Sequence, residues 1–133
     1  MTKKTHIAVG IALTLPLLSV LPKYVFIGLI GSVTPDFDLY TLGLIKHRTL
    51  THSLLALMTV TIIAMVFNFN IGMIFGYNYA IHLLLDSCTK TGVPLLYPFR
   101  KKYYGLKLIK TGEGADLFIC LIAAYLILTI IKF

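Results

Sequence analysis

The sequence predicts an all-α protein, a polytopic membrane helical bundle of about four to five short transmembrane or partly inserted helices. Two observations support this prediction, the composition of the chain and the order of its apolar segments. Of the 133 residues, 58% are hydrophobic and 13% are charged, whereas about a quarter of the residues of a soluble domain carry a charge. The mean hydropathy of +0.89 also excludes intrinsic disorder, which requires low hydrophobicity. The length fits a single integral membrane domain over residues 1–133.

The apolar residues fall into five segments, each shorter than the ~20 residues of a full membrane span. These segments are Ile7–Leu21, Tyr24–Val33, Ser53–Phe69, Ile71–Leu85 and Leu117–Ile131. We expect the first two, which a Pro-Lys turn separates, to form a helical hairpin that crosses the bilayer only in part. No small-x-small cleavage site follows the first segment, so we interpret it as a retained helix and not as a signal peptide. Strands are excluded because an open sheet edge cannot be satisfied in lipid.

Local signals predict how the helices end and meet. Thr49 or Thr51 is expected to cap the third helix, and the uncharged link Asn68-Phe69-Asn70 is expected to join the third helix to the fourth. Small residues favour close packing of the first two helices; they are Gly10, Gly28, Gly31 and Ser32.

The basic residues flank the apolar segments, which indicates membrane orientation and not nucleic-acid binding. With alternating spans, ten of the 12 Lys and Arg residues share one side. They are Lys3, Lys4, Lys46, Arg48, Lys90, Arg100, Lys101, Lys102, Lys107 and Lys110. The positive-inside rule makes that side cytoplasmic.

All four His residues and all five acidic residues are predicted at this same face. They are His6, His47, His52, His82, Asp36, Asp38, Asp86, Glu113 and Asp116. His82 and Asp86 are four residues apart, which puts them on one face of a helix about 6 Å apart, within reach of one divalent ion. A His–Asp hydrogen bond that joins two helices is the alternative interpretation of this pair.

Two further motifs extend the cluster. In Pro35-Asp36-Phe37-Asp38 an extended backbone would point the two carboxylates in opposite directions, although the motif alone also fits a helix cap. In the segment from His47 to Ser53, Arg48 is placed to pair with a phosphate or with one of the carboxylates, although this segment alone also fits a solvated cap. Mixed His and Asp ligands suit one to three divalent ions, with Zn²⁺ favoured, and paired ions suit hydrolysis of a phosphoester.

The order of these motifs resembles the YdjM-like membrane proteins, which are described as predicted membrane-bound metal-dependent hydrolases. The resemblance rests on Thr5-His6, Pro35-Asp36-x-Asp38, His47-Arg48-x-x-Thr51-His52-Ser53 and His82-x-x-x-Asp86-x-x-Thr89-x-x-Gly92. It implies a distant similarity to zinc-dependent phospholipase C and nominates as ligands His6, Asp36, His52, His82 and Asp86. It further implies Asp38 and His47 as ligands or partners of ligands, and Asp116 as a ligand with Glu113 as its competitor.

We therefore expect a membrane-bound metal-dependent hydrolase that acts on a phosphoester of a phospholipid or another lipid-linked phosphate. Asp36 or Asp38 would be the general base, while Arg48, Arg100 and Lys101 would bind the anionic substrate. Membrane lipids are the expected partners, and nucleic acid is not. The alternative is a non-enzymatic transport or interaction protein whose His/Asp site binds a structural or transported ion.

Overall fold

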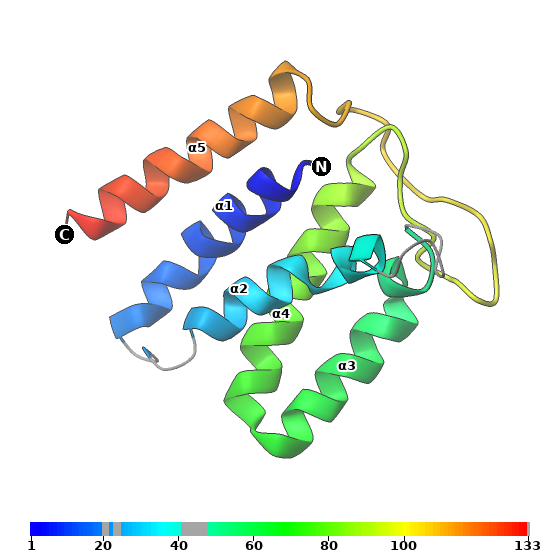
Figure 1. The fold of residues 1–133 in the computed structure, drawn as a ribbon, viewed down its shortest axis with the longest axis horizontal. Helices are drawn as coiled ribbons and strands as arrows, with labels where there is room; N and C mark the ends of the chain where they lie inside the picture. The colour runs from blue at the N-terminus through cyan, green and yellow to red at the C-terminus, as the bar shows by residue number, and fades with distance from the viewer. Residues whose placement is uncertain (20–21, 23–24, 41–47, 133) are drawn as a thin grey trace.

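The chain is helical throughout its secondary structure (Figure 1), in a computed structural model that describes residues 1–19, 22, 25–40 and 48–132. Its α-helices are α1 (Lys3–Thr14), α2 (Val25–Val33), α3 (Leu54–Phe67), α4 (Phe69–Ser87) and α5 (Gly114–Ile131). Short 3₁₀ helices join them: η1 (Leu15–Ser19), η3 (Thr34–Tyr40) and η4 (Leu50–His52). The described residues form no β-strand, only isolated bridges in the segment between α4 and α5. The all-α prediction is confirmed.

The helices pack around α2 and α4, as Figure 1 shows. The hairpin of α3 and α4 lies on one side of α2, and α1 and α5 lie side by side on the other side of α2. The core under α2 and α3 contains Phe75, Tyr79 and Leu83 from α4. The fold therefore brings the start of α1, the end of α2 and the end of α4 together.

The boundaries of α3 follow from its caps. Ser53, and not Thr49 or Thr51, caps its start, because the Ser53 hydroxyl accepts a hydrogen bond from the backbone N–H of Ala56 at 3.1 Å. The prediction of a threonine cap is wrong because the Thr51 side chain turns toward Asp38. Asn68 ends α3 and caps α4, which confirms the predicted link.

Small residues allow close contacts between helices, as predicted. A Cβ atom on Gly10 of α1 would stand 2.7 Å from the Cβ of Ser32 in α2. A Cβ atom on Gly31 would stand 2.5 Å from the backbone carbonyl oxygen of Phe75 in α4. The contact of Gly10 can be relieved by moving a side chain, but the contact of Gly31 is with backbone.

Gly31→Ala is therefore expected to destabilise the protein by about 1–3 kcal/mol, because α2 and α4 must separate to admit the methyl group. Thermal unfolding of the full chain in detergent measures the effect. Gly114→Ala is the matched control, since nothing lies within 4 Å of a Cβ atom at that position. Equal melting temperatures for the two variants would contradict the close approach of α2 to α4.

Much of the apolar surface is exposed, which fits a chain in contact with lipid. Among the described residues, α5 alone has the length and composition of a membrane span, with a mean hydropathy of 2.4 over 18 residues and 11% of them buried. The apolar helix α3 has 14 residues, none of them buried. The multi-pass arrangement and its cytoplasmic face stay predictions, because one candidate span does not establish either.

Candidate metal centre

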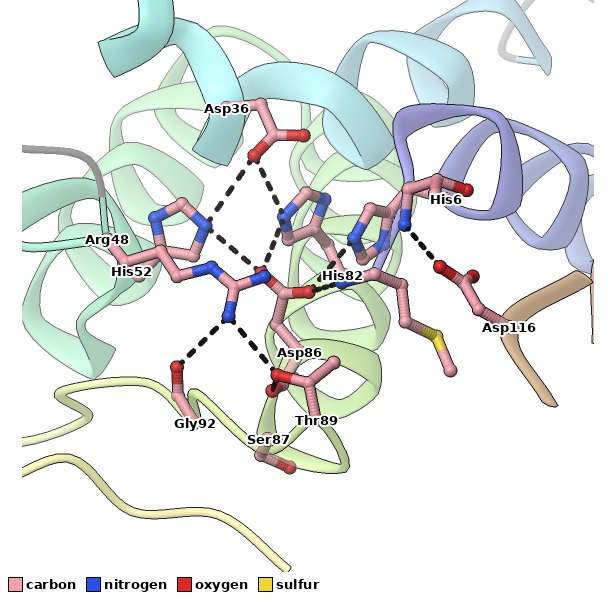
Figure 2. Close-up of polar contacts among 12 residues, drawn as sticks. His6, Asp36, Arg48, His52, His82, Asp86, Ser87, Thr89, Gly92 and Asp116 are labelled. Carbon is pink, nitrogen blue, oxygen red and sulfur yellow. Dashed lines mark hydrogen bonds and ion pairs between the residues drawn. The ribbon is translucent and has the colours of Figure 1, made fainter. Parts of the chain in front are cut away.

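Polar side chains converge from four segments of the chain at one end of the bundle (Figure 2). They come from the start of α1, from η3 after α2, from η4 before α3, and from the last turns of α4. The side chains are His6, Asp36, Asp38, Arg48, His52, His82 and Asp86, all of them at most 8% exposed. Such a concentration of buried ionisable groups is costly unless the groups compensate one another or hold an ion.

Two imidazoles and two carboxylates form the centre of this cluster. The Nε2 atom of His82 lies 3.7 Å from Oδ1 of Asp36 and 3.8 Å from Oδ2 of Asp86. The Nε2 atom of His52 lies 3.7 Å and 3.5 Å from the same two oxygens. These separations are too long for good hydrogen bonds. Ligands about 2.0–2.1 Å from a tetrahedral zinc ion stand about 3.3–3.4 Å apart, so small shifts would accommodate one.

The orientation of the His82 ring is fixed by a contact on the Nδ1 side. Its Nδ1 atom lies 2.6 Å from the carbonyl oxygen of Ser32. Since a carbonyl can only accept, Nδ1 carries the proton and Nε2 carries a lone pair. That Nε2 atom is buried and has no hydrogen-bond partner in the described part of the chain. The Nε2 lone pair of His82 therefore faces two carboxylate oxygens while its Nδ1–H is held by a carbonyl. Metal-binding histidines typically have this arrangement.

The orientation of His52 follows from a similar chain of contacts. The Thr51 hydroxyl donates to Oδ2 of Asp38 at 2.9 Å, so its oxygen is left to accept from Nδ1 of His52 at 3.1 Å. His52 Nδ1 is also 3.7 Å from the same carboxylate oxygen of Asp38. With its proton on Nδ1, His52 directs the lone pair of Nε2 toward Asp36 and Asp86.

Asp36 and Asp38 consequently have different surroundings. Asp36 faces both imidazoles, whereas Asp38 accepts hydrogen bonds from the Thr51 hydroxyl and from the backbone N–H of Arg48 at 2.9 Å. The extended backbone expected for this motif is wrong, because Thr34–Tyr40 forms a 3₁₀ helix. Within this 3₁₀ helix the side chains of Asp36 and Asp38 nevertheless contact different atoms of the site.

Asp86 is shared by more groups than any other residue of the cluster. Its Oδ1 atom accepts from Nε2 of His6 at 3.2 Å and contacts the amino group of Met1. Its Oδ2 atom lies near His52 and His82 and forms an ion pair with Nη2 of Arg48 at 3.0 Å. Asp86 therefore connects the metal-ligand geometry of the cluster to its cationic groups.

His6 packs directly on His82, with the ring centroids 3.7 Å apart and the planes inclined by 13°. Its Nδ1 atom is buried and makes no hydrogen bond within the described ranges. Two groups of side chains could hold a metal ion, His52 with His82 and Asp86, and His6 with Asp36 and His82; within each group the ligand atoms lie within 4.8 Å of one another. Both groups share His82, so the α4 motif is common to either ion position.

Arg48 is held in a left-handed backbone conformation with φ of 58°, which is uncommon outside Gly and marks a site of constraint. This conformation points its N–H to Asp38 while its guanidinium reaches Asp86, Thr89 and Gly92. In the described part of the chain, the Arg48 guanidinium and the Met1 amino group both contact Asp86. A divalent cation beside the two imidazoles would also place positive charge next to Asp36.

Comparison with known protein families gives a match. The chain matches the family described as YdjM inner membrane protein over residues 1–133, its whole length. The chain belongs to the YdjM inner membrane protein family. It is therefore a membrane protein, as its composition predicts. Comparison with curated proteins and with solved structures finds no match.

The structure brings together five of the ligands that the resemblance to the YdjM family implied, and it puts Asp38, implied as a ligand or a partner of one, beside Thr51 and His52. The five ligands are His6, Asp36, His52, His82 and Asp86. His47 lies outside the described residues, so its part in the site stays a prediction. Arg48 lies inside the cluster and pairs with a carboxylate, which is one of the two alternatives left open by the sequence.

Asp116 lies beside the cluster and outside both candidate ligand groups. Its carboxylate accepts hydrogen bonds from the Thr5 hydroxyl at 2.5 Å, from the N–H of Gly112 at 2.8 Å and from the N–H of Thr2 at 3.0 Å. It thus fixes the start of α1 next to His6. Its competitor Glu113 is exposed and pairs with Lys110.

Three residues have roles in the site that the sequence does not show. Ser32 acts through a backbone carbonyl, which carries no sequence signal. Thr51 was assigned to a helix cap, and only its contact with Asp38 reveals that it orients His52. The Tyr79 hydroxyl donates to the carbonyl oxygen of Thr51 at 2.5 Å and holds that segment against α4.

Proposed function

We propose that this protein is a metal-dependent hydrolase of a phosphoester in a phospholipid or another lipid-linked phosphate. One observation carries the proposal: His52 and His82 are both held through Nδ1, so that their Nε2 lone pairs face Asp36 Oδ1 and Asp86 Oδ2. Mixed nitrogen and oxygen ligands with these separations suit Zn²⁺.

The residues that would hold the ion are His52, His82 and Asp86, with His6 and Asp36 beside His82 for a second position. Three protein ligands would leave one position of a tetrahedral ion for water. When bound, a divalent ion supplies Lewis acidity to a phosphoryl oxygen and lowers the pKa of water. His6 and Arg48 hold Asp86, and Asp38 holds His52 through Thr51. These partners keep the ligand atoms in place before the substrate arrives.

Asp36 is our candidate for the proton acceptor. At 7% exposure it is the most accessible carboxylate of the cluster. In Figure 2 one of its oxygens faces the two imidazoles and the other points away from them. That second oxygen is positioned to take a proton from an attacking water while the first keeps its place in the cluster.

A substrate in the membrane fits the surroundings of the site. The exposed segment between α4 and α5 is basic, with Arg100, Lys101, Lys102, Lys107 and Lys110. Such a segment attracts anionic headgroups, and the apolar surfaces of α3 and α5 face the acyl chains. We place this side at the cytoplasmic face because of its basic residues.

The non-enzymatic alternative, a transported ion, would need polar groups that continue along the bundle. Among the described residues below His82, the fully buried polar side chains are Asn78 and Thr14, which hydrogen-bond each other at 3.1 Å. Beyond them the Thr61 hydroxyl oxygen is buried, and it has no hydrogen-bond partner in the described part of the chain. The next buried side chains of α4 are Ile74 and Phe75. Because the row of buried polar side chains does not continue along α4, we favour hydrolysis over ion transport.

Hydrolysis by the full chain purified in neutral detergent tests the proposal. Phosphate or headgroup release is measured on short-chain phosphatidic acid, short-chain phosphatidylcholine and a chromogenic phosphodiester. We expect turnover that a chelator abolishes and added Zn²⁺ restores. A metal-loaded, folded protein that turns over none of a broad set of lipid phosphoesters would support the non-enzymatic alternative instead.

A further inference from the structure

A pocket of about 390 Å³ lies beside the metal centre and is not part of it. It is lined by Thr49, Pro94, Tyr97, Lys101 and Tyr103. The last four belong to the segment between α4 and α5, for which the sequence predicts no helix. Its volume is within the range of pockets that bind small molecules.

The pocket is connected to the metal centre through Arg48. Thr49 follows Arg48 directly in the chain, and the Tyr103 hydroxyl donates to the carbonyl oxygen of Arg48 at 3.1 Å. The guanidinium of the same residue pairs with Asp86. One residue thus separates the pocket from the cluster.

Backbone contacts give the pocket a defined shape. Val93 and Tyr104 exchange a pair of backbone hydrogen bonds at 2.9 and 2.8 Å, which closes the segment on itself. The N–H of Leu54 donates to the carbonyl oxygen of Leu95 at 2.9 Å and ties the segment to the start of α3. The lining residues are therefore held next to η4 and do not depend on a free loop.

The chemistry of the lining selects an anion with an apolar part. Lys101 supplies a full positive charge, and Thr49 and Tyr97 supply hydroxyl groups, whereas the Tyr103 hydroxyl already donates to Arg48. None of the described lining side chains is acidic. The rings of the two tyrosines and of Pro94 offer apolar faces to a carbon skeleton.

We propose that this pocket is an anion subsite, in which Lys101 binds a phosphate-class group of the substrate headgroup beside the phosphoester held at the metal centre. This inference rests on the proposed function for the identity of the ligand as substrate. It names the substrate class as a lipid or soluble phosphate compound with a further negative charge, and not a zwitterionic lipid. It also separates Lys101 from the other basic residues of the segment, which act only through the surface potential.

Lys102 provides a matched control. Lys102 adjoins Lys101, is also exposed and carries the same charge. It does not line the pocket, and its Nζ atom lies 5.9 Å from the ring centroid of Tyr104. Lys101→Gln and Lys102→Gln therefore remove the same charge from the same segment. Only the first should affect a specific subsite.

The experiment is calorimetric titration of the full chain in neutral detergent with short-chain phosphatidylinositol 4-phosphate, inositol 1,4-bisphosphate and short-chain phosphatidylcholine. The first two carry a phosphate group in addition to the phosphoester, and phosphatidylcholine does not. We expect phosphatidylinositol 4-phosphate to bind more tightly than phosphatidylcholine, with an affinity that Lys101→Gln lowers at least about tenfold and Lys102→Gln lowers less than about twofold. Binding of phosphatidylinositol 4-phosphate but not inositol 1,4-bisphosphate identifies a lipid headgroup as the source, and equal binding of both identifies a soluble phosphate compound.

Equal losses in the two variants, or no preference of the wild type for an anionic ligand, would overturn the subsite. Binding is measured separately from turnover, so its loss with hydrolysis intact refutes the subsite alone. Specific binding without hydrolysis refutes the proposed reaction alone. Matching thermal unfolding of the two variants shows that both are folded.

Discussion

Asp86→Asn is expected to weaken the binding of a divalent metal by at least about 100-fold. Residues that support metal ligands cost about 10–100-fold in affinity when they are replaced, and Asp86 itself is proposed as a ligand between His52 and His82. Asparagine keeps the shape of the side chain but loses the charge that a cation requires. Metal content by elemental analysis and affinity by competition with a chelator measure the effect on the full chain.

Two further variants make this test decisive. Asp86→Asn leaves the Arg48 guanidinium without its charged partner, and breaking a buried pair costs about 3–5 kcal/mol, so the variant can fail to fold. His82→Ala removes a proposed ligand without exposing that charge. Glu113→Gln removes an exposed carboxylate on the same side and should retain the metal. If folded His82→Ala protein keeps wild-type affinity for Zn²⁺, the assigned metal centre is wrong.

Asp36→Asn is expected to reduce hydrolysis of the phosphoester by about 100-fold or more, the scale of removing a general base. Asp36 faces both imidazoles and is the most accessible carboxylate of the cluster. The amide cannot accept the proton and binds a cation less strongly. Initial rates at saturating metal separate the loss of the base from the loss of affinity.

Asp38→Asn is the matched control, since it makes the same change two residues away. Asp38 contacts His52 from behind and holds Thr51 and Arg48. Its replacement should cost less than Asp36→Asn, about 10-fold, because it disturbs the orientation of one ligand. The reverse order of effects would assign the catalytic role to Asp38.

Helix positions in this protein are largely determined by the sequence. Each of the five apolar segments contains or overlaps a helix, and the break at Asn68 falls where the uncharged link predicts it. These features are local, because apolar runs and side-chain caps depend on residues a few positions apart. The pair of His82 and Asp86 is local for the same reason, since four residues on a helix define one face. The predicted start of α3 is wrong because Ser53 and Thr51 are both common cap residues, and the contact of Thr51 with Asp38 decides between them.

The tertiary structure alone decided which role each polar residue has. Asp36 and Asp38 are equivalent in the sequence, and only the 3₁₀ turn and the positions of His52 and His82 distinguish a ligand from the residue that orients it. Asp116 is buried against Thr5 while Glu113 is exposed, and Lys101 lines a pocket while Lys102 does not. The physical reason is that a side chain's role depends on partners from segments far apart in the chain. The spacing of residues within one segment carries no information about those partners.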